Sequence, residues 1–107
     1  MKKDIRYVPT PLHIVNAMLD LGELRPDDFL IDLGSGDGRI PIQAALRGAR
    51  ARGVEIDGSL ARRSQYNAME AQVDHRVEFL VEDMFRADIS EATLLTLYLR
   101  HEVNAAL

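Results

Sequence analysis

The chain has 107 residues, of which 47% are hydrophobic and 28% are charged, and its net charge is -4. This composition fits one modest globular domain and is too short for two. The lack of cysteine excludes disulfides and thiolate metal sites and favours a cytoplasmic protein. We expect neither a secretory signal nor a membrane span, because no apolar run reaches the roughly 20 residues that a span needs.

Helices and strands are expected to alternate along the chain. Helical spacing of apolar residues predicts a first helix over residues 11–21, with Thr10 as its N-cap and Pro11 in its first position. Similar patterns predict strand 29–33, helix 38–46, strand 52–56, helix 59–72, strand 77–81 and strand 92–99. This alternation predicts an α/β fold with right-handed crossovers on a parallel sheet.

Two details of this pattern bear on the surface of the protein. The last predicted strand is apolar on both faces, which favours a central place in the sheet. The basic run "RGARAR" (residues 47–52) is interpreted as a solvated loop, and positive charge elsewhere is sparse. No nucleic-acid-binding surface is therefore predicted.

The stretch "IDLGSGDGR", residues 31–39, follows the first predicted strand and carries a glycine at every second position. A triphosphate-binding loop requires lysine and then serine or threonine after its last glycine, but Arg39 and Ile40 stand there. The dinucleotide fingerprint requires a glycine at the place of Arg39. Asp32, just before the glycines, suits a ligand whose polar head is cationic, which the glycines let the backbone approach closely.

Acidic residues stand at the expected carboxyl ends of three successive strands. Glu55 follows Asp32 by 23 residues and could accept hydrogen bonds from both hydroxyls of a ribose. Asp83 could accept from an adenine amino group, and Met84 and Phe85 could cover the ring or simply pack in the core. Because open α/β sheets bind ligands at this edge, we expect the three acids to converge on one crevice.

The quoted motifs resemble those of class I S-adenosylmethionine-dependent methyltransferases. "IDLGSGDGR" is similar to the first motif of that superfamily, "GVEID" to the second and "VEFLVEDMF" to the third. Together with "YVPTP" and "SEATLLTLYL", they resemble small bacterial relatives of mitochondrial protein-lysine methyltransferases that act on the c subunit of ATP synthase and the adenine nucleotide translocase. The resemblance runs from Tyr7 to about Leu99 and implies a Rossmann-like parallel sheet with flanking helices.

The resemblance also implies a site that binds S-adenosylmethionine and holds no metal. It assigns the cofactor to Tyr7, Asp32, Gly34, Ser35, Gly36, Gly38, Glu55, Ile56, Asp83 and Met84. Residues 32–38 would hold the methionine portion, Glu55 the ribose and Asp83 the adenine. Tyr98 would face the substrate amine as the catalytic residue, and Tyr7 would fold over the methionine end. The alternatives are a core aromatic for Tyr98, a packed anchor for Tyr7 and a surface position for His101.

The sequence departs from the family pattern near its end. Arg100 and His101 follow "TLYL" where the relatives usually continue with Leu-Pro. The superfamily sheet has seven strands, and this chain supplies about four. We therefore expect a single, incomplete domain over residues 1–107, truncated after the fourth strand, in which cofactor binding is better supported than catalysis.

The leading hypothesis is a methyltransferase that acts on a protein lysine, with a protein substrate as its partner. One alternative is an inactive module that binds the cofactor or forms a homo-oligomer through the edge of the last strand, which would otherwise be left unpaired. Others are a methyltransferase acting on RNA or a small molecule, and an NAD-dependent enzyme, against which the missing third glycine argues.

Overall fold

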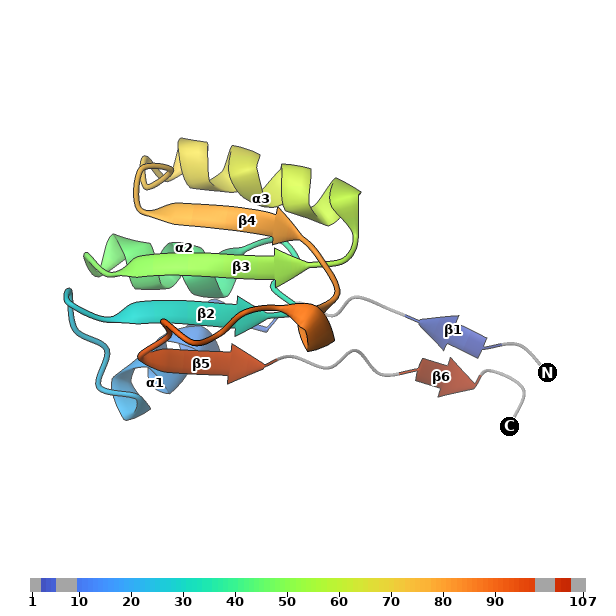
Figure 1. Cartoon of the computed structure of the whole chain (residues 1–107), viewed down its shortest axis with the longest axis horizontal. Coiled ribbons are helices and arrows are strands. Elements are labelled where there is room, and N and C mark those ends of the chain that lie inside the picture. Colours follow the sequence, from blue (N-terminus) through green and yellow to red (C-terminus); the bar gives the residue numbers. More distant parts are fainter. Residues whose placement is uncertain (1–2, 6–9, 98–101, 105–107) are drawn as a thin grey trace.

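A parallel four-stranded sheet forms the centre of the molecule. The structure is a computed structural model that describes residues 3–5, 10–97 and 102–104. The sheet contains β2 (Phe29–Leu33), β3 (Arg50–Glu55), β4 (Val77–Val81) and β5 (Leu94–Leu97) in the order β4-β3-β2-β5 (Figure 1). In its register, Asp32 on the inner strand β2 lies opposite Gly53 on one side and Thr96 on the other.

Three helices cover one face of the sheet: α1 (Leu12–Leu21), α2 (Arg39–Leu46) and α3 (Gly58–Glu70). One buried cluster joins α1 and α2 to β2 and β3 through Val15, Leu19, Leu30, Ile40, Ala44 and Ala51. A second cluster, formed by Ile42, Ala45, Ala68, Val73 and Phe79, joins α2 and α3 to β4. The helices thus fix both ends of the turn between β2 and α2, where the glycines lie.

The opposite face is covered by the segment that links β4 to β5. This segment contains a short 3-10 turn, η1 (Met84–Arg86), and crosses in front of β2 in Figure 1. Its residues Met84, Ala87 and Ala92 pack on a buried cluster of Phe29, Ile31, Leu33 and Val54. The part of the chain that the structure describes contains no helix long and apolar enough to cross a membrane.

Most predicted elements are confirmed, and β2 and β4 have the predicted bounds. The strand predicted at 52–56 begins two residues earlier, so the basic run is not wholly a loop. Arg50 and Arg52 point to the face that carries Phe29, and their guanidinium carbons lie 4.7 Å and 5.2 Å from its ring centroid. Packing on an aromatic ring explains how these arginines fit within a strand.

Other boundaries differ at the two ends of the chain. Pro11, not Thr10, is the N-cap of α1, and it has an extended backbone and no side-chain cap. The strand predicted at 92–99 begins at Leu94, is described as far as Leu97, and lies at an edge of the described sheet rather than at its centre. A short antiparallel pair, β1 (Lys3–Ile5) with β6 (Glu102–Asn104), was not predicted, because three-residue strands leave no readable alternation.

Candidate functional site

The glycine-rich turn joins β2 to α2 at the carboxyl edge of the sheet. Gly34, Gly36 and Gly38 have φ angles of 80°, 60° and 85°, a left-handed backbone that side chains disfavour. A Cβ on Gly38 would also stand 2.8 Å from the Phe79 ring and 2.9 Å from the Ser64 Cβ. The turn therefore needs glycine both for its conformation and for close packing against α3 and β4.

Glu55 fastens this turn to the end of β3. One carboxylate oxygen accepts from the Gly36 N–H at 2.8 Å, and the other accepts from the Asp57 N–H at 2.9 Å. The residue is only 1% exposed. The acid predicted to bind a ribose thus also holds the backbone of the glycine-rich turn, a role that the sequence pattern did not reveal.

Helix α3 holds the same turn from its other side. The Ser64 hydroxyl lies 2.9 Å from the Gly36 carbonyl, and the Asn67 amide donates to the Asp37 carbonyl at 3.0 Å. With two carbonyls held by α3, the turn is fixed at successive residues. The sequence analysis did not identify these contacts, whose signal is a serine between the alanines Ala61 and Ala68 on the buried face of α3.

Asp32 is buried in the sheet beside the turn. One carboxylate oxygen accepts from the Thr96 hydroxyl at 2.7 Å, whereas the other has no hydrogen-bond partner among the described residues. Burial raises the pKa of Asp32 to about 7, with the Thr96 bond opposing this rise and the charge of Glu55 adding to it. The Ser35 hydroxyl is the other buried polar side-chain atom without a partner in the described part of the chain.

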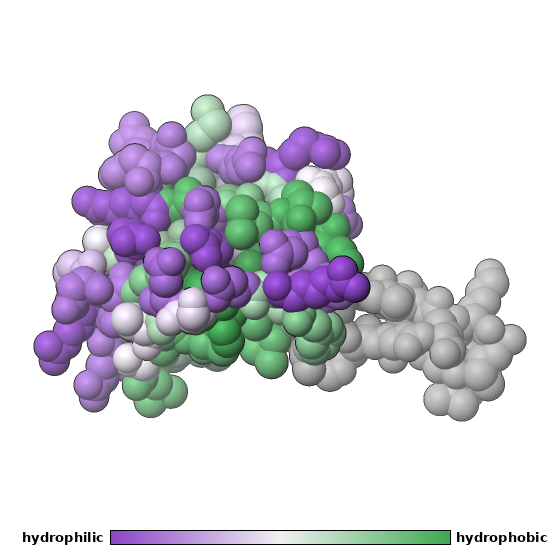
Figure 2. Space-filling view, viewed as in Figure 1, coloured by the Kyte–Doolittle hydropathy of each residue, from purple (hydrophilic) through white to green (hydrophobic). Residues whose placement is uncertain are grey.

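A pocket of about 230 Å³ opens beside Glu55 at the carboxyl ends of β3 and β4. It is lined by Gly34, Val54, Glu55, Ile56, Glu82, Asp83, Met84 and Phe85. Ile56 and Phe85 are 66% and 85% exposed, and apolar surface gathers at this end of the sheet in Figure 2. Asp83 lies at the rim, where its carboxylate accepts from the Phe85 N–H and caps η1.

This pocket combines apolar walls with acidic groups at one end and a glycine turn at its side. Apolar side chains can cover the faces of a flat heterocycle, and carboxylates can accept from hydroxyl and amino groups. These acceptors and walls fit a nucleoside, and the buried Asp32 adds a carboxylate suited to a cationic group. Five of the residues predicted to bind the cofactor line the pocket: Gly34, Glu55, Ile56, Asp83 and Met84.

Arg39 connects the glycine-rich turn to the segment that precedes α1. Its guanidinium makes two hydrogen bonds to the Asp37 carboxylate, at 3.1 Å and 2.7 Å, and donates to the Thr10 carbonyl at 3.0 Å. Thr10 is therefore held beside the turn. Tyr7 and Tyr98, predicted to bind the cofactor and to face the substrate, lie outside the described residues.

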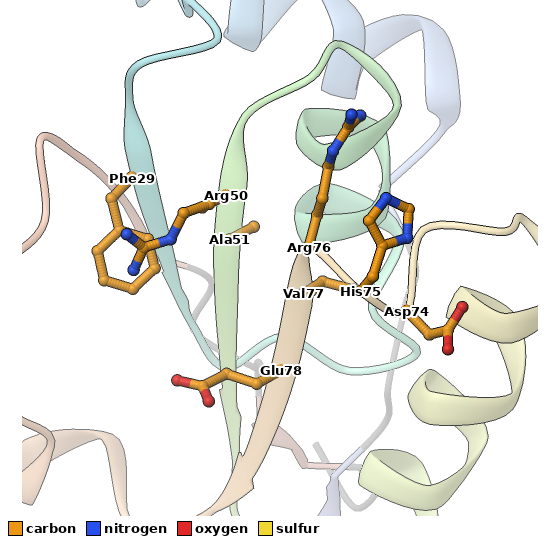
Figure 3. A pocket seen from close by; sticks show the side chains of 8 residues that line it. All are labelled: Phe29, Arg50, Ala51, Asp74, His75, Arg76, Val77 and Glu78. Carbon is orange, nitrogen blue, oxygen red and sulfur yellow. The ribbon is translucent and has the colours of Figure 1, made fainter.

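A larger cavity of about 320 Å³ lies at the opposite, amino edge of the strands. It is lined by Phe29, Arg50, Ala51, Asp74, His75, Arg76, Val77 and Glu78. Figure 3 shows that its charged side chains diverge: Arg50 extends toward Phe29, whereas Arg76 and His75 point away from it. Because these cations do not converge, the cavity does not present a cluster of positive charge to an anion. Within the residues that the structure describes, no group of three or more histidine or acidic side chains could hold a metal ion.

Comparison with known proteins places these features among methyltransferases. A model of the ANTKMT methyltransferase domain family matches residues 32–107. A protein-lysine N-methyltransferase of Saccharolobus islandicus is 40% identical over 105 residues, which cover 96% of this chain and 65% of that protein. A lysine N-methyltransferase of the ATP synthase c subunit, from Xenopus laevis, is 36% identical over 84 residues, which cover 78% of this chain and 37% of that protein.

Solved structures agree on the fold. The crystal structure of an RNA methyltransferase from Salinibacter ruber, in complex with S-adenosyl-L-homocysteine, is 54% identical. It superposes with a TM-score of 0.84 and covers 86% of this chain and 61% of that one. The chain thus spans less than two thirds of the length of the relatives that it matches.

Proposed function

The chain belongs to the ANTKMT methyltransferase domain family, and we propose on that basis that it binds S-adenosylmethionine and transfers its methyl group to a protein lysine. Two observations support the lysine acceptor: the family model covers residues 32–107, and the Saccharolobus relative is a protein-lysine N-methyltransferase at 40% identity. The single observation that carries the cofactor is the pocket that Glu55 shares with the glycine-rich turn.

In this proposal the turn from Asp32 to Gly38, with Ser35 and Gly36, holds the methionine portion of the cofactor. Glu55 accepts the ribose hydroxyls, because its carboxylate lines the pocket at the carboxyl end of β3 and a carboxylate oxygen can accept more than one hydrogen bond. Asp83 binds the adenine amino group, and Ile56 and Met84 cover the ring. Bound there, the cofactor would supply an already activated methyl group on a sulfonium.

The protein's contribution to such a transfer is positioning and exclusion of water. The fixed turn and the buried end of β2 orient one reactant. A lysine acceptor must lose a proton before it attacks, and an apolar pocket promotes this by lowering the pKa of the amine. We assign that pocket to Tyr98 and Tyr7, and replacing Tyr98 with alanine is expected to lower turnover without weakening cofactor binding.

A second acceptor class is RNA. It is favoured by the Salinibacter relative, an RNA methyltransferase at 54% identity. A third candidate function, which the sequence analysis left open, is a module that binds the cofactor without turnover. Both alternatives keep the cofactor site and differ in what the protein does with it.

Calorimetric titration with S-adenosylhomocysteine tests the cofactor site. We expect binding to the folded protein and at least about a tenfold loss in Glu55→Ala, because that change removes a charged acceptor and frees the turn. Glu78→Ala is the matched control, since Glu78 pairs with Arg52 and lines the cavity at the amino edge. Equal affinity for the two variants, or no heat with the folded wild type, would contradict the proposal.

Incubation of cell lysate with tritiated S-adenosylmethionine identifies the acceptor. We expect label that protease releases and RNase leaves in place, with methyl-lysine in the hydrolysed protein. Label that RNase releases would move the assignment to RNA. Binding without label in any fraction would support the inactive module.

Two further predictions of the sequence belong to this proposal. We propose self-association through β5, because this strand pairs with β2 on one side only within the described sheet. We also propose that the protein is cytoplasmic, which fractionation of cells that express it would check.

A further inference from the structure

Two buried polar atoms without partners lie around Gly53 on β3. Asp32 is directly opposite Gly53 in the sheet, and one of its carboxylate oxygens is unpaired among the described residues. The Ser35 hydroxyl, also unpaired there, lies 2.6 Å from where a Cβ on Gly53 would stand. Buried polar atoms normally have hydrogen-bond partners, so this pair indicates a place for a polar group of a ligand.

Thr96 is the side chain that holds Asp32 from the other strand. It lies opposite Asp32 in the register of β5 with β2, and its hydroxyl donates to the carboxylate at 2.7 Å. A donor at this distance stabilises the ionised carboxylate over the neutral acid and fixes the orientation of its second oxygen. Thr96 thus acts on both the charge and the direction of the Asp32 side chain.

We propose that Thr96 is a positioning residue of the cofactor site, whose hydroxyl keeps Asp32 charged and oriented so that it can receive a cationic amine. This inference rests on the proposed function. It deepens that function by assigning to the edge strand β5 a part in binding the amino-acid end of the cofactor. The sequence motif names Asp32 alone, because Thr96 lies 64 residues further along the chain.

The surroundings of Asp32 favour its neutral form, so the hydrogen bond from Thr96 matters for keeping the carboxylate ionised. Burial raises the pKa of Asp32 to about 7, and the charge of Glu55 on β3 acts in the same direction. Ser35 in the turn is uncharged, and Asp37 in the turn pairs with Arg39, the first residue of α2. Binding of a cationic amine should therefore weaken as pH falls through about 7, and loss of the Thr96 donor should move this midpoint upward.

Replacing Thr96 with valine removes the donor and keeps the shape of the side chain. We expect the affinity for S-adenosylhomocysteine, titrated from about pH 5.5 to about pH 9, to keep its value at high pH. The midpoint of its pH dependence should rise by about one unit, which lowers affinity several-fold at neutral pH. Thr96→Ser, which retains the hydroxyl, should restore the wild-type midpoint.

Two controls separate this role from a loss of stability. Thr93→Val removes a similar bond to Asp28, 2.8 Å long, at the other end of the same segment, and should leave the midpoint unchanged. The nucleoside 5′-methylthioadenosine lacks the amino-acid end, so its affinity should not show the Thr96-dependent shift. Carbon-13 NMR of the Asp32 carboxyl in the free protein should give the same upward shift in Thr96→Val.

Each result decides between the proposals. An identical midpoint in wild type and Thr96→Val, with S-adenosylhomocysteine bound by both, would overturn the role of Thr96 and leave the cofactor assignment standing. An equal shift for 5′-methylthioadenosine would also overturn it, because the amine would then be irrelevant. No binding to the folded wild type at any pH would instead refute the proposed function.

Discussion

The buried Asp32 carboxylate is proposed to bind the cofactor, but its negative charge lowers the stability of the fold. Its pKa in the folded protein is raised from 3.8 to about 7 by burial. A group whose folded pKa lies above its unfolded value stabilises the fold below the unfolded pKa, and that contribution is lost as pH rises through the folded value. The free protein should therefore lose stability between about pH 4 and pH 7, by about 4 kcal/mol at about 1.4 kcal/mol per unit.

Asp32→Asn should remove this dependence. We expect the variant to be about 2 kcal/mol more stable than wild type at pH 8, somewhat less than the full charge effect because the amide brings donors that need partners. Urea unfolding at several pH values measures the difference, and calorimetry should show weaker binding of S-adenosylhomocysteine. An unchanged pH slope in the variant would show that Asp32 does not carry the charge effect.

At the scale of residues, the sequence predicted the acids and glycines of the site but not what holds them. Asp32, Glu55 and Asp83 stand at strand ends, and strand ends are readable from apolar runs. The bonds from Thr96 to Asp32 and from Asn67 to the Asp37 carbonyl depend on register and on helix rotation. Those quantities are set by packing across long sequence separations, which no local pattern encodes.

At the scale of elements, β3 supports the turn because it carries no side chain at Gly53. A Cβ there would stand 2.6 Å from both the Phe79 ring and the Ser35 hydroxyl. The strand thus makes room for a core aromatic from β4 on one side and for the glycine-rich turn on the other. This requirement could not be predicted, because a lone glycine within a strand pattern has several explanations.

Gly53→Ala should therefore disturb fold and site together. We expect a loss of stability of about 1–3 kcal/mol from overpacking and weaker binding of S-adenosylhomocysteine. Gly58→Ala in α3 is the control, since its Cβ would meet only Arg62, at 3.7 Å, and alanine favours the helix. Thermal unfolding and calorimetry check both variants. Unchanged binding of S-adenosylhomocysteine in a destabilised Gly53→Ala variant would show that Gly53 supports the fold but not the cofactor site.

Element types were predictable where periodicity was long and boundaries were marked by glycine. The first residues of β3 and β5 could not be predicted in this way. Arg50 looked like part of a charged loop, and only the Phe29 ring beneath it explains its place in a strand. For β5, apolarity on both sides indicated a central strand, whereas Leu95 and Leu97 are 45% and 56% exposed at the edge.

At the scale of the whole molecule, the helices cover one face of the sheet, and the other face is covered over β2 and β3 by the link from β4. Leu95 and Leu97 alternate with Leu94, which packs toward α1, and with Thr96, which bonds to Asp32. They therefore lie on the face away from the helices, beside an unpaired edge of the described sheet. An exposed apolar edge strand favours pairing with another chain.

This edge predicts self-association that depends on concentration. Light scattering coupled to size exclusion should find dimers or larger species at about 100 μM, within the micromolar range where exposed edges associate. The double substitution Leu95→Lys and Leu97→Lys should shift the protein toward monomer, because charges on an edge strand oppose pairing. The matched control is Leu21→Lys, at an 86% exposed position on α1. A monomeric wild type would refute the prediction.

The pairing of β2 with β5 also has a consequence for the order of folding. Neighbouring elements from α1 to β4 can assemble through contacts close in sequence, whereas β5 must return across 64 residues to reach β2. Loop closure of this length slows the step, so β5 should dock last among the four strands of the parallel sheet. During synthesis β2 would remain a bare edge until residues 94–97 leave the ribosome, and a chaperone that shields apolar strands would have its main target there.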